Sequence, residues 1–247
     1  MQSGIPGLDD LFYGKFPKGK TMLLSGPPGA GKTVFCMQFL VAGAISDAEE
    51  PAVYVAFDDM PNHIRRDMQT FGWDIETLEN SEPPLLTIVD GFSGRVGLTT
   101  KERFAIRPNI DSLLITLRDI LQTTGATRIV IDSLTTISSV VKNPEQVRKE
   151  ILTMSSILGD QGCTTILTAE LGGSESSALS LASRYGVEEY SAQGSIILSY
   201  YENPSGEYDR ALLIQKMRGH RHIFGWRKFT ISEDGVNVFP DQGIERY

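Results

Sequence analysis

Eight residues near the start of the chain constrain its fold more than any other feature. Residues 26–33 read Gly-Pro-Pro-Gly-Ala-Gly-Lys-Thr and match the Walker A pattern G-x-x-x-x-G-K-[ST] without a gap. Residues 21–25 have the apolar run of a buried strand, and residues 34–45 are apolar on nearly every face, as in a central helix. The expected order is therefore strand, loop, helix, and the expected ligand is a nucleoside triphosphate.

The residue types of this loop suit phosphate binding. Glycines let the backbone turn sharply, so that N–H groups of the loop and of the helix start approach phosphate oxygens. We expect Lys32 to neutralise the β- and γ-phosphates and the Thr33 hydroxyl to bind Mg²⁺. A glycine-rich turn that matches by chance is the alternative, which the flanking elements disfavour. The residues expected to contact the nucleotide here are Gly29, Ala30, Gly31, Lys32, Thr33 and Val34.

Predicted strands and helices alternate over the first two-thirds of the chain. This alternation predicts an α/β fold with a mostly parallel sheet, helices on both faces and ligand at the carboxyl ends of the strands. Short strands follow and predict a C-terminal antiparallel β extension. The predicted strands cover residues 21–25, 52–57, 85–89, 128–133, 164–169, 195–200, 209–215, 229–231 and 236–238, and the helices after residue 60 end at Gly72, end at Gly125, or begin at Pro144.

Several local signals concern the connections. Asn143 is expected to cap the helix that follows it, with Gln146 in the position of a capping box. Residues 90–108 and 172–183 are rich in glycine, serine and threonine without clear periodicity, and are expected to form loops. A length of 247 residues is common for a single α/β unit. One domain over residues 1–247 is therefore the expected organisation.

Composition argues against several classes of partner. The formal charge of −8, from 31 acidic and 23 basic residues, disfavours general attraction to nucleic acid or anionic lipid. No stretch reaches the roughly 18 apolar residues of a membrane span, and the first residues lack the features of a secretion signal. Cys36 and Cys163 fall in apolar elements and are expected to be buried thiols. A cytoplasmic location without a membrane partner is therefore expected.

Carboxylates follow two of the predicted strands. Asp132 ends one of them, where a carboxylate would orient the Mg²⁺ shell, although such a residue can also simply cap a turn. Asp58 and Asp59 follow another and should reach the same sheet edge, where they could orient a water for attack on the γ-phosphorus. The alternative for this pair is a solvated start to the helix that begins near Pro61.

One segment concentrates positive charge in an otherwise acidic chain. Residues 216–228 read Lys-Met-Arg-Gly-His-Arg-His-Ile-Phe-Gly-Trp-Arg-Lys, with five basic side chains and two histidines. Such a concentration is expected to bind an anion, either the phosphates of a nucleotide or a nucleic-acid backbone. A solvated strand edge that carries protective charge is the alternative.

Together with several further segments, these residues resemble the KaiC-type ATPases of the RecA superfamily over nearly the whole chain. The resemblance implies ATP and Mg²⁺ held between neighbouring subunits of a homo-oligomer, commonly a six-membered ring, and a protein partner whose identity it leaves open. The matching segments are Gly4–Asp9, residues 26–33, Phe71–Asp74, Ile131–Ser133, Arg184–Glu189, Lys216–Gly219 and Ile231–Val236.

The resemblance also gives individual residues a role. Lys216 and Arg218 would reach the γ-phosphate bound by the adjacent subunit, with His222 close by. Glu170 ends the fifth strand, where RecA-like proteins tend to place a residue that senses the γ-phosphate; an ordinary strand-end carboxylate is the alternative. The residues that the resemblance places near the base or ribose are Thr70, Ser232 and Glu233.

The expected catalytic pair departs from the family's pattern. The family usually has two glutamates after the second strand, whereas this chain has Asp58 and Asp59. Aspartate is shorter by one carbon–carbon bond, about 1.5 Å, and a misplacement near 1 Å can lower a rate on the order of 100-fold. We therefore expect tight Mg·ATP binding with slow hydrolysis.

The sequence favours one function and leaves two others open. The favoured function is an ATP-binding, slowly hydrolysing oligomer that is switched by its nucleotide and acts on a protein partner. The first alternative is a RadA-like recombination paralogue that binds DNA, which the basic segment supports and the net charge disfavours. The second is an assembly module that binds ATP without hydrolysing it.

Overall fold

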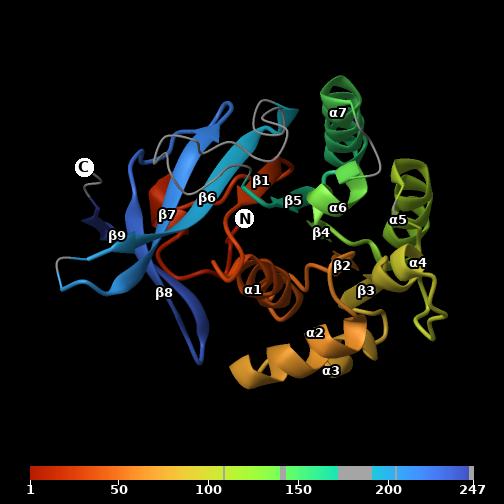
Figure 1. Cartoon of the computed structure of the whole chain (residues 1–247). Coiled ribbons are helices and arrows are strands. Elements are labelled where there is room, and N and C mark those ends of the chain that lie inside the picture. Colours follow the sequence, from red (N-terminus) through yellow and green to blue (C-terminus); the bar gives the residue numbers. More distant parts are fainter. Residues whose placement is uncertain (108, 140–142, 172–190, 204, 245–247) are drawn as a thin grey trace.

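A nine-stranded sheet runs through the described part of this computed structural model (Figure 1), in the order β3-β2-β4-β5-β1-β6-β7-β8-β9. The structure describes residues 1–107, 109–139, 143–171, 191–203 and 205–244. The strands are β1 (Thr21–Ser25), β2 (Ala52–Ala56), β3 (Leu86–Asp90), β4 (Arg128–Asp132), β5 (Thr164–Ala169), β6 (Gly194–Glu202), β7 (Tyr208–Met217), β8 (Arg227–Ser232) and β9 (Gly235–Gly243). Every strand predicted from the sequence is present, with shifted ends.

The first six strands are parallel, and the last three are antiparallel. β1 pairs in parallel with β5 and β6, and β2 pairs in parallel with β3 and β4. β7, β8 and β9 extend this sheet as antiparallel neighbours on the side drawn in blue. The predicted α/β fold with an antiparallel extension is therefore confirmed, and the carboxyl ends of the parallel strands meet at one edge.

Helices cover both faces of the parallel part. α1, α2 and α3 lie on one face, whereas α4 to α7 lie toward the other (Figure 1). The helical elements are η1 (Asp9–Phe12), α1 (Lys32–Ala44), α2 (Pro61–Met68), η2 (Gln69–Phe71), α3 (Ile75–Glu79), α4 (Phe92–Val96), α5 (Ile110–Thr124), α6 (Leu134–Ser139) and α7 (Pro144–Asp160). None of the helices among the described residues has the length and apolar character needed to cross a bilayer.

Alternate side chains of the central strands enter two separate cores. Leu24 and Tyr54 pack with α1 on one face, whereas Leu23 and Val53, one position earlier, pack with α5 and α7 on the other. This period of two is what a strand buried on both sides requires. Cys36 and Cys163 are buried free thiols, as predicted.

Two local predictions were wrong. Residues 90–108 were expected to be an irregular loop, but they include the five-residue helix α4, and Ala105 bridges back to Asp90. A helix this short shows no periodicity in its sequence, which explains the error. Asn143 does cap α7 by accepting from the Glu145 N–H at 2.9 Å, but Gln146 donates to Glu150 at 3.1 Å instead of closing a capping box.

A buried arginine joins the sheet to the first residues of the chain. Arg128 is 2% exposed, and its guanidinium donates to the backbone carbonyl oxygens of Gln2, at 2.8 Å, and Phe39, at 2.7 Å. Its Nε and Nη2 donate to Glu50 Oε2 at 2.8 and 2.5 Å. Since a buried cation needs a partner, Glu50 provides the compensating charge.

Candidate active site

The phosphate-loop residues connect β1 to α1 in a conformation that needs glycine. Gly29 and Gly31 have φ angles of 77° and 97°, in the left-handed region that side chains disfavour. A Cβ atom on Gly31 would also lie 2.4 Å from Ile231 Cδ1. Gly31 is the N-cap residue of α1, and no side chain caps this helix. The first N–H groups of α1 are therefore available to an anionic ligand.

The Lys32 ammonium lies over the same loop. Its Nζ donates to the carbonyl oxygens of Gly26, at 2.8 Å, and Pro27, at 3.1 Å. Burial lowers the pKa of Lys32, and the Asp132 and Glu170 carboxylates partly oppose that shift. The ammonium therefore faces two carboxylates in a half-buried setting, which suits a cation that neutralises phosphate.

Asp132 at the end of β4 is held by three hydroxyl groups. Thr33 Oγ1 donates to its Oδ2 at 3.1 Å, and the Tyr54 hydroxyl donates to the same oxygen. Thr168 Oγ1 donates to Oδ1 at 2.5 Å. The sequence did not indicate Tyr54 and Thr168, which come from the two strands beside β4. For Tyr54, a hydroxyl on an otherwise apolar buried strand was the available signal.

These residues surround one cavity of about 230 Å³ at the carboxyl edge of the sheet. Oxygen ligands from a threonine and a carboxylate suit Mg²⁺, which usually takes only one or two protein ligands besides phosphate and water. No cluster of three or more metal-binding His, Cys, Asp or Glu side chains occurs among the described residues. The cavity is lined by Lys32, Thr33, Tyr54, Ala56, Asp58, Asp59, Ile64, Asp132, Ser133 and Glu170.

The two aspartates after β2 both reach this cavity, and each already has partners. Asp58 Oδ1 accepts from Arg95 Nη1 at 3.2 Å and from the Thr136 hydroxyl. Asp59 Oδ1 accepts from the backbone N–H of Met60 at 2.7 Å and lies 2.9 Å from His63 Nδ1. The pair therefore lines the cavity while also making bonds to residues of α2, α4 and α6.

The residues expected near a base or ribose belong to elements that meet beside the start of α1. Ile231 precedes Ser232 and Glu233 and packs against Gly31. A Cβ atom on Gly235 would lie 2.8 Å from the Trp73 ring, so the β8–β9 turn approaches the segment after Thr70. The turn that carries Ser232 and Glu233 therefore lies beside Trp73, three residues after Thr70.

The basic segment begins beside the amino ends of β1 and β6, at the other end of these strands from the phosphate loop. Lys216 pairs with Ser195 near the start of β6, and its Nζ donates to the Ala192 carbonyl at 2.8 Å. The Arg218 N–H donates to the Gln193 carbonyl at 2.8 Å, level with the first residue of β1. The phosphate loop starts five residues further on, about 16 Å along the strand direction. Lys216 and Arg218 therefore lie far from the phosphate loop of their own chain.

Residues 221–223 of this segment fold against the beginning of the chain. The Ile223 N–H donates to the Leu11 carbonyl at 2.8 Å, and the Arg221 guanidinium lies 4.7 Å from the centre of the Tyr13 ring. His222 Nδ1 lies 3.4 Å from the His220 carbonyl oxygen. These contacts place His222 beside the segment from Leu11 to Tyr13.

Comparison with known proteins identifies the family. The family model described as "ATPase: KaiC" matches residues 1–243. The chain belongs to the KaiC family of ATPases. A UPF0273 protein of Methanocaldococcus jannaschii is 36% identical over 99% of this chain and 98% of its own length. The circadian clock oscillator protein KaiC of Parathermosynechococcus lividus is 34% identical over 97% of this chain, but only 42% of that protein is matched.

A solved structure agrees with this assignment. A KaiC-like protein from Pyrococcus horikoshii has a TM-score of 0.78 and 35% sequence identity, covering 97% of this chain and 98% of the other. The resemblance inferred from the sequence is therefore confirmed. Of the segments that supported it, Arg184–Glu189 lies outside the described residues, as does the predicted loop at 172–183.

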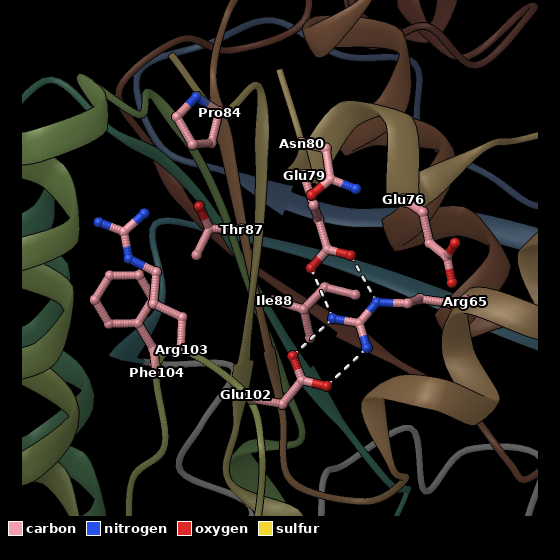
Figure 2. A pocket seen from close by; sticks show the side chains of 10 residues that line it. All are labelled: Arg65, Glu76, Glu79, Asn80, Pro84, Thr87, Ile88, Glu102, Arg103 and Phe104. Atoms are coloured by element: carbon pink, nitrogen blue, oxygen red, sulfur yellow. Dashed lines mark hydrogen bonds and ion pairs between the residues drawn. The ribbon is translucent and has the colours of Figure 1, made fainter. Parts of the chain in front are cut away.

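This KaiC-family chain has a second cavity, of about 420 Å³, at the β3 edge of the sheet. Figure 2 shows the Arg65 guanidinium between the carboxylates of Glu79 and Glu102, with N–O distances of 2.6 to 2.8 Å. Both carboxylates raise the pKa of Arg65. Arg65, Glu79 and Glu102 are therefore paired with one another, and this cluster joins α2, α3 and the segment after α4. Sequence analysis did not anticipate it.

Proposed function

We propose that this chain binds Mg·ATP at the 230 Å³ cavity and hydrolyses it slowly at interfaces between copies of itself. Membership of an ATPase family supports the nucleotide. Lys32 and the open N-terminus of α1 would hold the phosphates, and Thr33 and Asp132 would hold Mg²⁺. The ion would supply positive charge to the β- and γ-phosphate oxygens.

The observation that carries the proposal is the separation of two cationic groups. The phosphate loop lies at the carboxyl ends of the parallel strands, whereas Lys216 and Arg218 lie at their amino ends. A second copy that packs head to tail can bring its own Lys216 and Arg218 to the γ-phosphate of the first. Cations delivered in this way contribute on the order of 10³–10⁵ in rate.

The remaining roles follow from the same arrangement. Asp58 or Asp59 would orient the attacking water, and their short side chains and existing hydrogen bonds make turnover slow. Glu170 lies on the cavity beside Lys32, where it would sense the γ-phosphate. In this proposal Thr70, Ser232 and Glu233 contact the base and ribose, and His222 accompanies Arg218 from the neighbouring copy.

Mixing two inactive variants tests the shared site. Lys32→Ala removes the ammonium that binds phosphate in one copy, and Arg218→Ala removes the cation that the neighbouring copy supplies. Each variant alone should therefore release phosphate at background rates. In mixed oligomers about a quarter of the interfaces combine an intact Lys32 with an intact Arg218. Recovery of about a quarter of wild-type turnover is expected. No recovery, with both variants folded and assembled by native mass analysis, would refute a site shared between copies.

A second experiment tests why turnover is slow. The double replacement Asp58→Glu and Asp59→Glu extends both carboxylates by about 1.5 Å. Turnover should rise, by up to about 100-fold if reach alone limits the rate. A drop in turnover with unchanged Mg·ATP affinity would contradict the assignment. Retained nucleotide with no turnover in any variant would favour a structural ATP site.

DNA binding is a weaker candidate for this chain. Basic side chains of the segment are engaged within the fold: besides Lys216 and Arg221, Lys228 contacts Asp209 at 2.9 Å, and Arg227 donates to the Pro240 carbonyl at 2.8 Å. The net charge of −8 also opposes a polyanion. Stimulation of turnover by single-stranded DNA, with affinity that falls steeply as salt rises, would reverse this preference.

A further inference from the structure

The expected water-orienting carboxylate is bound by an arginine that the sequence did not identify. Arg95 Nη1 donates to Asp58 Oδ1 at 3.2 Å and to Thr136 Oγ1 at 3.2 Å, and the Thr136 hydroxyl donates to the same Asp58 oxygen. We propose that Arg95 is a positioning residue that holds Asp58 against α6 and thereby restrains hydrolysis. This inference rests on the proposed function of Asp58.

The direction of the pull follows from where the partners lie. Asp58 lines the cavity beside the phosphate loop, whereas neither Arg95 nor Thr136 is among its lining residues. Both donors therefore engage the carboxylate from outside the space in which the γ-phosphate and the attacking water would lie. An oxygen that already accepts two hydrogen bonds is less available to accept one from water. Release of Arg95 would let the carboxylate turn toward the cavity.

Two glycines seat α4 so closely that Arg95 has a fixed origin. A Cβ atom on Gly91 would lie 2.3 Å from the Phe57 ring, next to Asp58 in sequence, and one on Gly94 would lie 2.2 Å from the Ile106 carbonyl oxygen. The Ser93 N–H donates to Asp90 Oδ1 at 2.9 Å at the start of the helix. At Gly91 and Gly94 the packing leaves no space for a methyl group, so the backbone of α4 cannot shift easily. The Arg95 side chain therefore starts from a fixed position near Asp58.

The segment after α4 is anchored as well. The Asp90 N–H donates to the Phe104 carbonyl and the Ile106 N–H donates to the Asp90 carbonyl, each at 2.9 Å. Glu102 is bound to Arg65 of α2 by two hydrogen bonds of 2.7 Å (Figure 2). α2 itself begins just after the aspartate pair. The segment after α4 is therefore bound to the helix that directly follows Asp58 and Asp59.

The ion pair itself is weak enough to open. The Arg95 and Asp58 side chains are 38% and 44% exposed, and pairs of this exposure contribute little because water screens them. Arg95 also has an alternative contact, the Phe92 ring at 5.4 Å from its guanidinium carbon. A modest increase in turnover, about two- to fivefold, is therefore expected when the restraint is removed.

The test compares Arg95→Met with wild type in steady-state phosphate release at saturating Mg·ATP. We expect kcat to rise about two- to fivefold with little change in KM. Arg95→Lys keeps the charge and should stay within about twofold of wild type. Arg66→Met is the matched control, because Arg66 makes a similar exposed ion pair with Asp67 at 3.2 Å, and should leave kcat unchanged.

Two further measurements separate positioning from general loosening. In an Asp58→Asn background, Arg95→Met should no longer raise turnover; a rise that persists there would overturn the inference. A double-mutant cycle on the denaturation midpoint should show coupling between Arg95 and Asp58. An unchanged or lower kcat in Arg95→Met, while Lys32→Ala abolishes wild-type turnover, refutes this inference alone. Absence of Lys32-dependent turnover in both wild type and Arg95→Met refutes the proposed function with it.

Discussion

Replacement of Glu50 by glutamine should destabilise this chain far more than its position outside any helix or strand suggests. Glu50 is the carboxylate that compensates Arg128, whose side chain is only 3% exposed, and both contacts are at or below 2.8 Å. The substitution keeps the size of the side chain but removes its charge. It leaves a buried guanidinium with backbone carbonyl oxygens alone.

The size of the effect follows from the burial of the pair. Removal of one partner from a buried ion pair costs about 3–5 kcal/mol, because the other charge remains without compensation. Glu50 is 17% exposed, so some water can reach the guanidinium and the lower end, about 3 kcal/mol, is expected. At roughly 2–4 °C per kcal/mol for a chain of this size, the Tm should fall by about 6–12 °C.

Urea denaturation without nucleotide measures this directly, since a bound ligand would add its own stabilisation. Glu49→Gln is the matched control: Glu49 is exposed, it precedes Glu50 in the same turn, and its substitution should change the unfolding free energy by less than about 0.5 kcal/mol. A loss below about 1 kcal/mol for Glu50→Gln, with the control unchanged, would refute the view that this carboxylate compensates Arg128.

Three further predictions use other parts of the fold. Gly94→Ala should lower the denaturation midpoint, because the new Cβ would lie 2.2 Å from a carbonyl oxygen, whereas Gly159→Ala in α7 meets nothing closer than 3.7 Å and should stabilise by about 0.5–1 kcal/mol; equal effects would contradict the packing argument. Burial raises the pKa of Cys163 from 9.0 to about 11, so alkylation of this thiol at pH 8.5 should be at least tenfold slower in the folded protein than in urea. The free energy of unfolding should also fall as pH rises from 9 to 11, because the thiol of the unfolded chain ionises first. Tyr54→Phe removes a hydroxyl that donates to Asp132 and should weaken Mg·ATP binding about five- to tenfold by calorimetry; unchanged affinity would exclude that role.

The parallel strands and their order along the chain could be predicted because each is a short, mostly apolar run that ends in a polar residue or is followed by one within two positions. Burial on both faces leaves this signal in every strand, whether it packs on α1 or on α5. α4 could not be found in this way, since five residues complete barely more than one turn. Its position also depends on the close packing of Gly91 and Gly94 against residues that are not their neighbours in the sequence.

The candidate site divides in the same manner. Lys32, Thr33 and Asp132 were identified because a local pattern and a strand end give their positions. Arg95 and Tyr54 were not, because each reaches the site across a gap in the sequence that no local pattern encodes: Tyr54 is 78 residues from Asp132. The distance of Arg218 from its own phosphate loop likewise required the register of β6 and β7.

The phosphate loop and Arg218 lie at opposite ends of the parallel strands, so activity should depend on the concentration of the protein. On the proposed function, a solitary copy holds one half of a site on each side and completes neither. In an open row, the two terminal copies each keep one incomplete half-site, whereas in a closed ring every half-site is completed by a neighbour. The rate per molecule should therefore fall on dilution more steeply than nucleotide occupancy does.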